Sequence, residues 1–344
     1  MKLGFSAIIG LTAIAGAVFV ATTFTTPPID SVQRGYRGTG MIQSYQDRAY
    51  TRLVAANQAP EVLPAVDPEG KKASAEYKNL TVLGDLDKAE FDRLMMAMTN
   101  WVSPDAGCNY CHNPEDMASD ELYTKVVARR MLEMVGTINT KFKAHVANTG
   151  VTCYTCHRGQ PVPSYVWYTD TNISHASGYA PIPSGQNRAA AAVAYTALPY
   201  DVFTPFLKDA TDLRVISSQA LPQTDTGARK SIMQAEWTYG LMTHISDGLG
   251  VNCTYCHNTR SFTDWNQSSP QRVVAWNAIR HVRELNNTVL DPLAKILPAS
   301  RLGPAGDAPK INCTTCHQGT FKPLLGVSQL KDYPELATPL SIKN

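Results

Sequence analysis

The placement of the cysteines constrains this chain more than any other feature of its sequence. All eight fall in four Cys-x-x-Cys-His units, numbered 1 to 4 in chain order: Cys108/Cys111/His112, Cys153/Cys156/His157, Cys253/Cys256/His257 and Cys313/Cys316/His317. In such a unit two thiols can bond the two vinyl groups of one haem, and the following histidine is placed to bind the iron. One unit alone could be a redox dithiol or half of a zinc site. Four complete units without a spare cysteine predict four covalently attached haem c groups.

The composition predicts a helical protein with long loops. The 344 residues are 44% apolar, enough to bury a sizeable core, and the net charge of +2 gives no indication of nucleic-acid binding. The chain contains 22 glycines and 22 prolines, and no window alternates apolar and polar residues as a half-buried strand does. We therefore expect a mainly α, loop-rich multihaem cytochrome.

The N-terminal sequence indicates export and membrane attachment. Haem c is attached on the far side of the cytoplasmic membrane, so a chain with four attachment units must be exported. An uncharged apolar run of 22 residues extends from Leu3 to Phe24, and as a helix it would span about 33 Å. This run is longer than the apolar core of a typical signal peptide. We expect residues 1–25 to form a membrane anchor or uncleaved signal, with the rest of the chain on the periplasmic side of the inner membrane.

The two halves of the chain repeat each other. Unit 1 resembles unit 3 and unit 2 resembles unit 4. Outside the units, residues recur at a constant offset of 147: Met95 and Met242, Val126-Val127-Ala128 and Val273-Val274-Ala275, Asn139 and Asn286. Such agreement predicts an internal duplication of a haem-pair module. The expected organisation is an anchor over 1–25, an extended segment over 26–68, a first haem pair over 69–160, a connecting segment over 161–224, and a second haem pair with the C-terminal tail over 225–344.

Methionines upstream of the units are candidates for the second axial ligand, which sets the potential of a haem. A thioether favours Fe(II) more than a second imidazole does. The helix expected over 91–101 holds three methionines ahead of unit 1. The repeat selects Met95 over Met96 and Met98, because Met242 precedes unit 3 in the same way.

The ligands of units 2 and 4 come from a second expected helix, over 121–145. Its apolar stripe contains Met131 and Met134, and Met131 is preferred for unit 2. The residue 147 positions after Met131 is Ala278, which cannot bind iron, so unit 4 needs another ligand. His145 lies about 40° around the helix from Met131 and about 21 Å along it, and His281 on the equivalent second helix competes with it. Two further histidines are weaker candidates: His175 and His244.

Three further segments carry a family resemblance: Gln33-Arg-Gly-Tyr-Arg-Gly-Thr-Gly-Met41, Leu297-Pro-Ala-Ser-Arg-Leu-Gly303 and Leu330-Lys-Asp-Tyr-Pro-Glu-Leu336. With the four units and their spacing, they make the chain resemble the tetrahaem cytochrome subunit of purple-bacterial photosynthetic reaction centres. The resemblance implies three Met/His haems and one His/His haem, with ligands at Met95, Met131, Met242 and His145. It also implies a mostly helical fold with haem pairs related by a pseudo-twofold axis.

The resemblance further implies an electron carrier rather than an enzyme. The subunit would lie on the L and M subunits of a reaction centre, in a complex with the H subunit and the light-harvesting 1 antenna. It would take electrons from a soluble cytochrome c or high-potential iron–sulfur protein and re-reduce the photo-oxidised bacteriochlorophyll pair. The unit 3 haem would be nearest that pair and the unit 1 haem furthest. Many relatives have a lipidated N-terminal cysteine, but no cysteine precedes Cys108, so we expect no lipid anchor.

Two other functional classes remain as alternatives. A multihaem nitrite or hydroxylamine oxidoreductase would need a five-coordinate haem. A membrane-anchored tetrahaem quinol oxidase would favour His/His ligation, against which the methionines ahead of the units argue.

Charged residues near units 1 and 3 are the last candidates for a functional role. Arg272 matches a family arginine near the haem closest to the bacteriochlorophyll pair, where a positive charge would disfavour Fe(III) and raise the potential; it could equally be a helix-start arginine that points to water. From Asp85 to Glu121, nine acids outnumber two bases. These acids are either an ordinary solvated surface or a docking patch for a basic soluble cytochrome. The candidate docking residues are Glu115, Asp116, Asp120 and Glu121.

Overall fold

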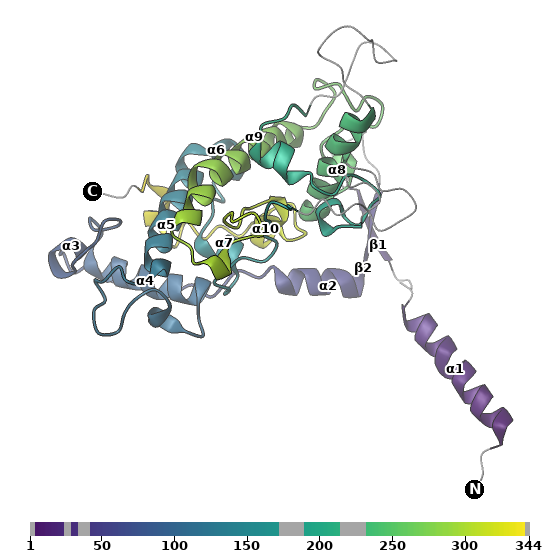
Figure 1. Ribbon diagram of the computed structural model, residues 1–344, viewed down its shortest axis with the longest axis horizontal. Helices are drawn as coiled ribbons and strands as arrows, with labels where there is room; N and C mark the ends of the chain where they lie inside the picture. The colour runs from purple at the N-terminus through teal and green to yellow at the C-terminus, as the bar shows by residue number, and fades with distance from the viewer. Residues whose placement is uncertain (1–3, 24–28, 34–41, 172–188, 214–231, 341–344) are drawn as a thin grey trace.

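Helices joined by long irregular segments make up most of the chain (Figure 1). The computed structural model describes residues 4–23, 29–33, 42–171, 189–213 and 232–340. Within these ranges the only sheet is a two-stranded antiparallel hairpin, in which β1 (Ile29–Gln33) pairs with β2 (Ile42–Gln46). The expectation of a mainly helical, loop-rich fold is confirmed.

The N-terminal helix α1 (Phe5–Thr23) projects away from the body of the molecule, on the side of α8 and far from α3 and α4 (Figure 1). The segment from Ser6 to Thr23 is long and apolar enough to cross a membrane, and none of its residues is buried by the rest of the chain. An exposed helix without a charged residue is unfavourable in water. This arrangement fits the expected anchor.

The segment expected to be extended contains a helix, α2 (Asp47–Ala56). Asp47 lies in its first turn, where a carboxylate interacts favourably with the helix dipole. At its C-terminal end the buried side chain of Asn57 donates to Leu53 O and Gln318 O. A hydrogen bond to Gln318, 261 residues later in the chain, therefore holds the end of this helix next to unit 4.

The first half of the molecule carries units 1 and 2. Its helices are α3 (Ala73–Glu76), α4 (Lys88–Val102), η1 (Gly107–Tyr110), α5 (Tyr123–Lys141), α6 (Lys143–Val146) and α7 (Cys153–His157). The Asp87 side chain caps α4 by accepting from Ala89 N. One face of α4 is buried, with the helical spacing expected of a core-facing stripe: Phe91, Leu94, Ala97 and Trp101.

The second half carries units 3 and 4. Its helices are α8 (Ile232–Leu249), η4 (Cys253–Tyr255), α9 (Pro270–Leu285), η5 (Asn286–Leu290), η6 (Asp291–Lys295), η7 (Ala299–Arg301), α10 (Cys313–His317), η8 (Pro323–Gly326) and η9 (Pro334–Ala337). The connection between the halves was expected to follow the surface. It instead forms two short helical turns, η2 (Ala191–Val193) and η3 (Thr204–Lys208), and contributes to the core. Its fully buried side chains include Val193, Val202, Phe206 and Leu207.

The expectation of one continuous helix from 121 to 145 is wrong. Helix α5 ends at Lys141, and Phe142 has φ −102° and ψ 29°, outside the helical region. The Phe142 side chain is buried and stacks on His281 with 3.9 Å between ring centres. His145 therefore lies on the separate short helix α6, and its direction cannot be derived from that of Met131.

Two asparagines separated by 147 residues make the same three hydrogen bonds. Asn139 Nδ2 donates to Val151 O and Leu336 O, and Asn139 Oδ1 accepts from Val151 N. Asn286 does the same with Ile311 as the counterpart of Val151, and Leu207 O as the third partner. Both side chains are buried. Each asparagine therefore fixes the segment of the chain that leads into unit 2 or unit 4.

Replacing Asn139 with alanine should destabilise the protein. The change leaves Val151 N–H and two carbonyl oxygens without this partner, and one buried group left unpaired costs about 1–3 kcal/mol. We expect the free energy of unfolding to fall by about 2–4 kcal/mol, measured by denaturant titration with circular dichroism. The control is Asn287→Ala, which removes one hydrogen bond of an exposed side chain and should change stability by about 0.5 kcal/mol or less. Equal effects of the two variants would contradict this account.

Candidate functional site

In each of the four units the histidine makes the same hydrogen bond. The Nδ1 atoms of His112, His157, His257 and His317 lie 2.9 Å from the backbone oxygens of Met117, Gln160, Phe262 and Thr320, respectively. A carbonyl oxygen only accepts, so Nδ1 must carry the proton and Nε2 keeps its lone pair. This is the arrangement of a metal-binding histidine whose other nitrogen is held by the protein.

Units 2 and 4 are short helices with matched ends. Helix α7 begins in a capping box between Thr152 and Thr155, and α10 begins in one between Asn312 and Thr315. Both helices end at a residue in the left-handed region. These caps hold the two cysteines and the histidine of each unit within one short helix of five residues.

Units 1 and 3 are tight turns with their own matched contacts. The side-chain oxygen of Asn113 accepts from Glu115 N, and that of Asn258 accepts from Arg260 N. Each turn is also tied to the next helix by a hydroxyl that donates to a tyrosine carbonyl of the unit: Thr124 to Tyr110 and Ser269 to Tyr255. Local side-chain hydrogen bonds thus set the shape of both units.

A large cavity adjoins unit 1. Its volume is about 670 Å³, within the range of about 300–1,000 Å³ typical of cofactor and ligand sites. Its lining includes both thiol-bearing residues and the histidine of unit 1, as well as Met95, Met96 and Met98 of α4. A cavity with two thiols, an imidazole and a thioether on its walls fits a covalently attached haem.

The other candidate methionines divide by burial. Met134 is buried in the core, whereas Met131 and Met242 are partly buried and pack at its edge. Met96 is 53% exposed, although it also lines the unit 1 cavity. Met131 and Met242, at the edge of the core, can reach a group bound between the core and a unit. Met134, inside the core, cannot.

His145 faces the histidine of unit 4. The ring centres of His145 and His317 are 6.2 Å apart, and the ring planes differ by 22°. Two metal–nitrogen bonds of about 2.0–2.1 Å, with the distance from each nitrogen to its ring centre, bring opposed imidazoles to roughly 6 Å. The competing His281 instead stacks face to face on Phe142, with an angle of 5° between the planes. The spacing of His145 and His317 fits one iron between them.

Burial keeps the candidate imidazoles neutral. It lowers the pKa of His145 to about 3, with smaller contributions from His317 and His281. Burial likewise lowers the pKa of His157, His257 and His317. Because only a neutral imidazole offers a lone pair, these environments favour metal binding over protonation.

Partial or complete burial keeps four of the thiols protonated. Burial raises the pKa of Cys153 and Cys313 to about 12, and that of Cys111 and Cys256 to about 11. Such thiols are poor nucleophiles and poor bare-metal ligands at neutral pH. These environments therefore do not resemble that of a catalytic dithiol.

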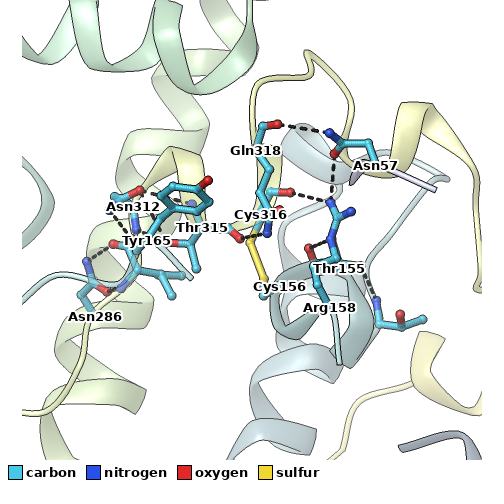
Figure 2. The surroundings of a disulfide bond; sticks show 12 residues. Asn57, Thr155, Cys156, Arg158, Tyr165, Asn286, Asn312, Thr315, Cys316 and Gln318 are labelled. Atoms are coloured by element: carbon cyan, nitrogen blue, oxygen red, sulfur yellow. Dashed lines mark hydrogen bonds between the residues drawn. A yellow bond between two sulfur atoms is a disulfide. The ribbon is translucent and has the colours of Figure 1, made fainter. Parts of the chain in front are cut away.

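Two of the other four cysteines, Cys156 and Cys316, form a disulfide (Figure 2), with 4.5 Å between their Cα atoms. We expected both to bond haem. A disulfide and a thioether at the same sulfur exclude each other, so haem attachment at units 2 and 4 would need these two sulfurs as separate thiols.

The four units lie in the order 1, 2, 4, 3. Helices α7 and α10 are in contact at the centre, where Arg158 Nη2 donates to Asn57 Oδ1 and Cys316 O (Figure 2). On one side, Gly159 N donates to Trp101 O of α4, which leads into unit 1. On the other side, Gly319 N donates to Gly248 O of α8, which leads into unit 3. Figure 1 shows the same sequence, with α7 and α10 between α4 and α8.

Comparison with known proteins identifies the family. Residues 25–337 match the family described as photosynthetic reaction centre cytochrome C subunit. The chain is 54% identical to the subunit of that name from Thermochromatium tepidum, over 90% of this chain and 76% of that protein. It is 51% identical to the one from Rubrivivax gelatinosus, over 95% and 88%, and 39% identical to the one from Roseobacter denitrificans, over 97% and 93%.

The chain belongs to the photosynthetic reaction centre cytochrome c subunit family. The resemblance seen in the sequence is confirmed. Cytochrome c subunits hold covalently bound haem c and transfer electrons, and a reaction-centre subunit is associated with a membrane complex. The four Cys-x-x-Cys-His units are the candidate attachment sites for such haem in this chain.

Arg272 lies beside unit 3. Its guanidinium donates to Ser268 Oγ and Thr263 O, and it stacks on Trp265 at 4.1 Å from the ring centre. Its charge adds to burial in lowering the pKa of His257. The arginine therefore does not simply extend into water, and its charge acts at this unit.

The acidic residues near unit 1 divide into two groups. Asp120 accepts from Arg129 Nη1 at 2.8 Å and lies 3.4 Å from Lys125 Nζ, so its charge is paired within the protein. Glu115, Asp116 and Glu121 are exposed and form no ion pair in the described part of the chain. These three carboxylates are the surface charge available to a partner.

The two weaker histidine candidates give no support for ligation. His244 is buried against Phe203 with an edge-to-face contact. His175 lies outside the described residues.

Proposed function

We propose that the chain carries four haem c groups, one per unit, and relays electrons along the row 1, 2, 4, 3. The observation that supports this is the row itself: four histidines, each held through Nδ1 by an equal hydrogen bond, in units that lie next to one another. A bound haem supplies one-electron redox chemistry. The protein fixes the distances between neighbouring sites and tunes each potential through axial ligands, burial and charge.

The proposed axial ligands are Met95 with His112, Met131 with His157, Met242 with His257, and His145 with His317. The cavity next to Met95 supports the first pair, and the ring spacing of His145 and His317 supports the last. The recurrence of the same hydrogen bonds at an offset of 147 residues supports a duplicated haem-pair module. Three Met/His haems and one His/His haem would then differ in potential along the row.

The two ends of the row have different surfaces, which supports a direction of electron flow. The unit 1 end carries exposed carboxylates, and charged surfaces suit brief encounters with a soluble partner. The unit 3 end exposes Phe262, Trp265, Val273 and Trp276, and an apolar aromatic surface suits a lasting interface. Helix α1 also lies on the same side of the molecule as α8, which leads into unit 3 (Figure 1).

On this basis the unit 3 end is proposed to lie on the L and M subunits of a reaction centre, in a complex with the H subunit and light-harvesting 1 antenna. It would there re-reduce the photo-oxidised bacteriochlorophyll pair. Unit 1 would accept electrons from a soluble cytochrome c or high-potential iron–sulfur protein. The body of the chain would be on the periplasmic side, with α1 as its anchor.

The proposed ligand of unit 4 is tested by His145→Ala, with His281→Ala as the matched control. Loss of His145 should remove the His/His signal from the electron paramagnetic resonance spectrum and change one low-potential step in a redox titration. The three Met/His haems should keep their potentials, because His145 touches none of them. If His281→Ala removes the His/His signal and His145→Ala keeps it, the assignment is reversed.

The proposed role of Arg272 is tested by removing its charge. Arg272→Leu should lower the potential of the unit 3 haem by about 60 mV, the size of a tenfold shift in a one-electron equilibrium. Arg272→Lys keeps the charge and should keep most of the potential. A Leu variant whose unit 3 haem titrates as in the unchanged protein would remove Arg272 from the list of tuning residues.

The proposed function is tested by flash spectroscopy on the complex purified with its bacteriochlorophyll-containing subunits. A flash should oxidise haem within the complex, and a basic soluble cytochrome should re-reduce it. Salt should slow the second-order rate by about tenfold or more, because it screens the attraction between charged partners. Absence of flash-induced haem oxidation would contradict the function.

Charge reversal then tests the docking surface. Glu115→Lys and Asp116→Lys should each slow re-reduction at low salt. The control is Asp209→Lys, which reverses an exposed acid in the connecting segment and should leave the rate nearly unchanged. Equal rates in all three variants would mean that the donor docks elsewhere.

A further inference from the structure

Lys125 is a buried cation beside unit 1 with an unusual set of partners. It lies in the first turn of α5, and its side chain is only 10% exposed. Its Nζ donates to three successive carbonyl oxygens, those of Met117 at 3.0 Å, Ala118 at 2.7 Å and Ser119 at 2.9 Å. A lysine ammonium has three N–H donors, so the loop that follows unit 1 uses all of them.

One of these oxygens links the ammonium to the axial histidine. Met117 O accepts from Lys125 Nζ at 3.0 Å and from His112 Nδ1 at 2.9 Å. A carbonyl oxygen has two lone pairs and can accept both bonds. The cation is therefore connected to the imidazole through a single atom.

The second half has a base at the corresponding position. Arg272 lies 147 residues after Lys125, and it donates to Thr263 O. Thr263 follows Phe262, whose carbonyl accepts from His257. Both halves thus direct a cation from the start of a helix to the loop that holds the axial histidine.

We propose that Lys125 is a positioning and tuning residue that raises the midpoint potential of the unit 1 haem. A hydrogen bond from His112 Nδ1 to a carbonyl increases electron donation by the imidazole, which favours Fe(III). An ammonium on the same oxygen withdraws electron density from it and weakens that effect. The buried positive charge also disfavours the additional charge of Fe(III). This inference rests on the proposed haem at unit 1 with Met95 and His112 as ligands.

The nearby charges do not cancel the ammonium. Asp120 lies 3.4 Å from Lys125 Nζ, but it also pairs with Arg129 at 2.8 Å, so the three groups together carry one positive charge. The carboxylates of Glu115, Asp116 and Glu121 are exposed, where water and salt screen them. The surface acids can therefore attract a donor while Lys125 keeps the potential of the receiving haem high.

The test is a redox titration of the haem-loaded protein carrying Lys125→Gln, Lys125→Arg or the control Arg130→Gln. Glutamine at position 125 removes the charge but can still donate to two carbonyls. Arg130 serves as the control because it is an exposed cation on the same helix that pairs with Glu133. The unit 1 step is identified with Met95→His, which should lower that step alone. We expect Lys125→Gln to change the ratio of reduced to oxidised unit 1 haem about tenfold at fixed potential, which is a fall of about 59 mV. Lys125→Arg and Arg130→Gln should leave the step in place.

The outcomes separate this inference from the proposed function. If Lys125→Gln keeps four haems per chain and its unit 1 step does not move, the inference is overturned. A parallel fall in all four steps would also overturn it, because that result indicates general loosening. If Met95→His moves no step, the ligand assignment of the proposed function fails, and this inference fails with it. Should Lys125→Gln not retain haem, Asp120→Asn provides the second test, and an unchanged or lower unit 1 potential in that variant overturns the proposal.

Discussion

The contact between α7 and α10 determines where the four Cys-x-x-Cys-His units lie relative to one another. Each helix begins in a capping box and ends at a left-handed residue, so the histidine of each unit leaves its helix in a defined direction. On the other side of α10, its contact with α8 depends on close approach by glycine. Gly250 has φ +61°, and a Cβ atom there would lie 2.0 Å from Gly319 O. Any larger residue would push the chain ahead of unit 3 away from unit 4 and change the distance between these two units.

Part of this fold could be predicted from the sequence because its causes are local. The helix expected over 91–101 lies within α4, since its apolar spacing and its Asp87 cap are readable in the sequence. The recurrence of Asn139 at Asn286 also identified two buried residues that make equivalent hydrogen bonds. The end of α5 could not be predicted, because Phe142 leaves the helix to stack on His281, a residue from the other half. The helix α2 is likewise held by Gln318, far along the chain.

The candidate site could likewise be predicted only in part from the sequence. The four units are visible in the sequence, and so is the short spacing between each histidine and its carbonyl partner: five residues in units 1 and 3, and three in units 2 and 4. The choice between His145 and His281 was not decidable from helical geometry, because the break at Phe142 separates His145 from the helix of Met131. Lys125 was missed, although it adjoins the repeated Val126-Val127-Ala128 and has its counterpart in Arg272.

Exposure decides what each charge near unit 1 can do. A carboxylate in water acts over a distance set by the ions around it, about 8 Å at physiological ionic strength. It can guide a charged partner, but it has little effect on an iron within the protein. A buried ammonium with three carbonyl partners is shielded far less by solvent and stays in one position. Glu115 and Asp116 can therefore serve association while Lys125 serves the potential, although all three lie within eleven residues of one another. Asp120 pairs with both Lys125 and Arg129, so its charge is compensated within the protein.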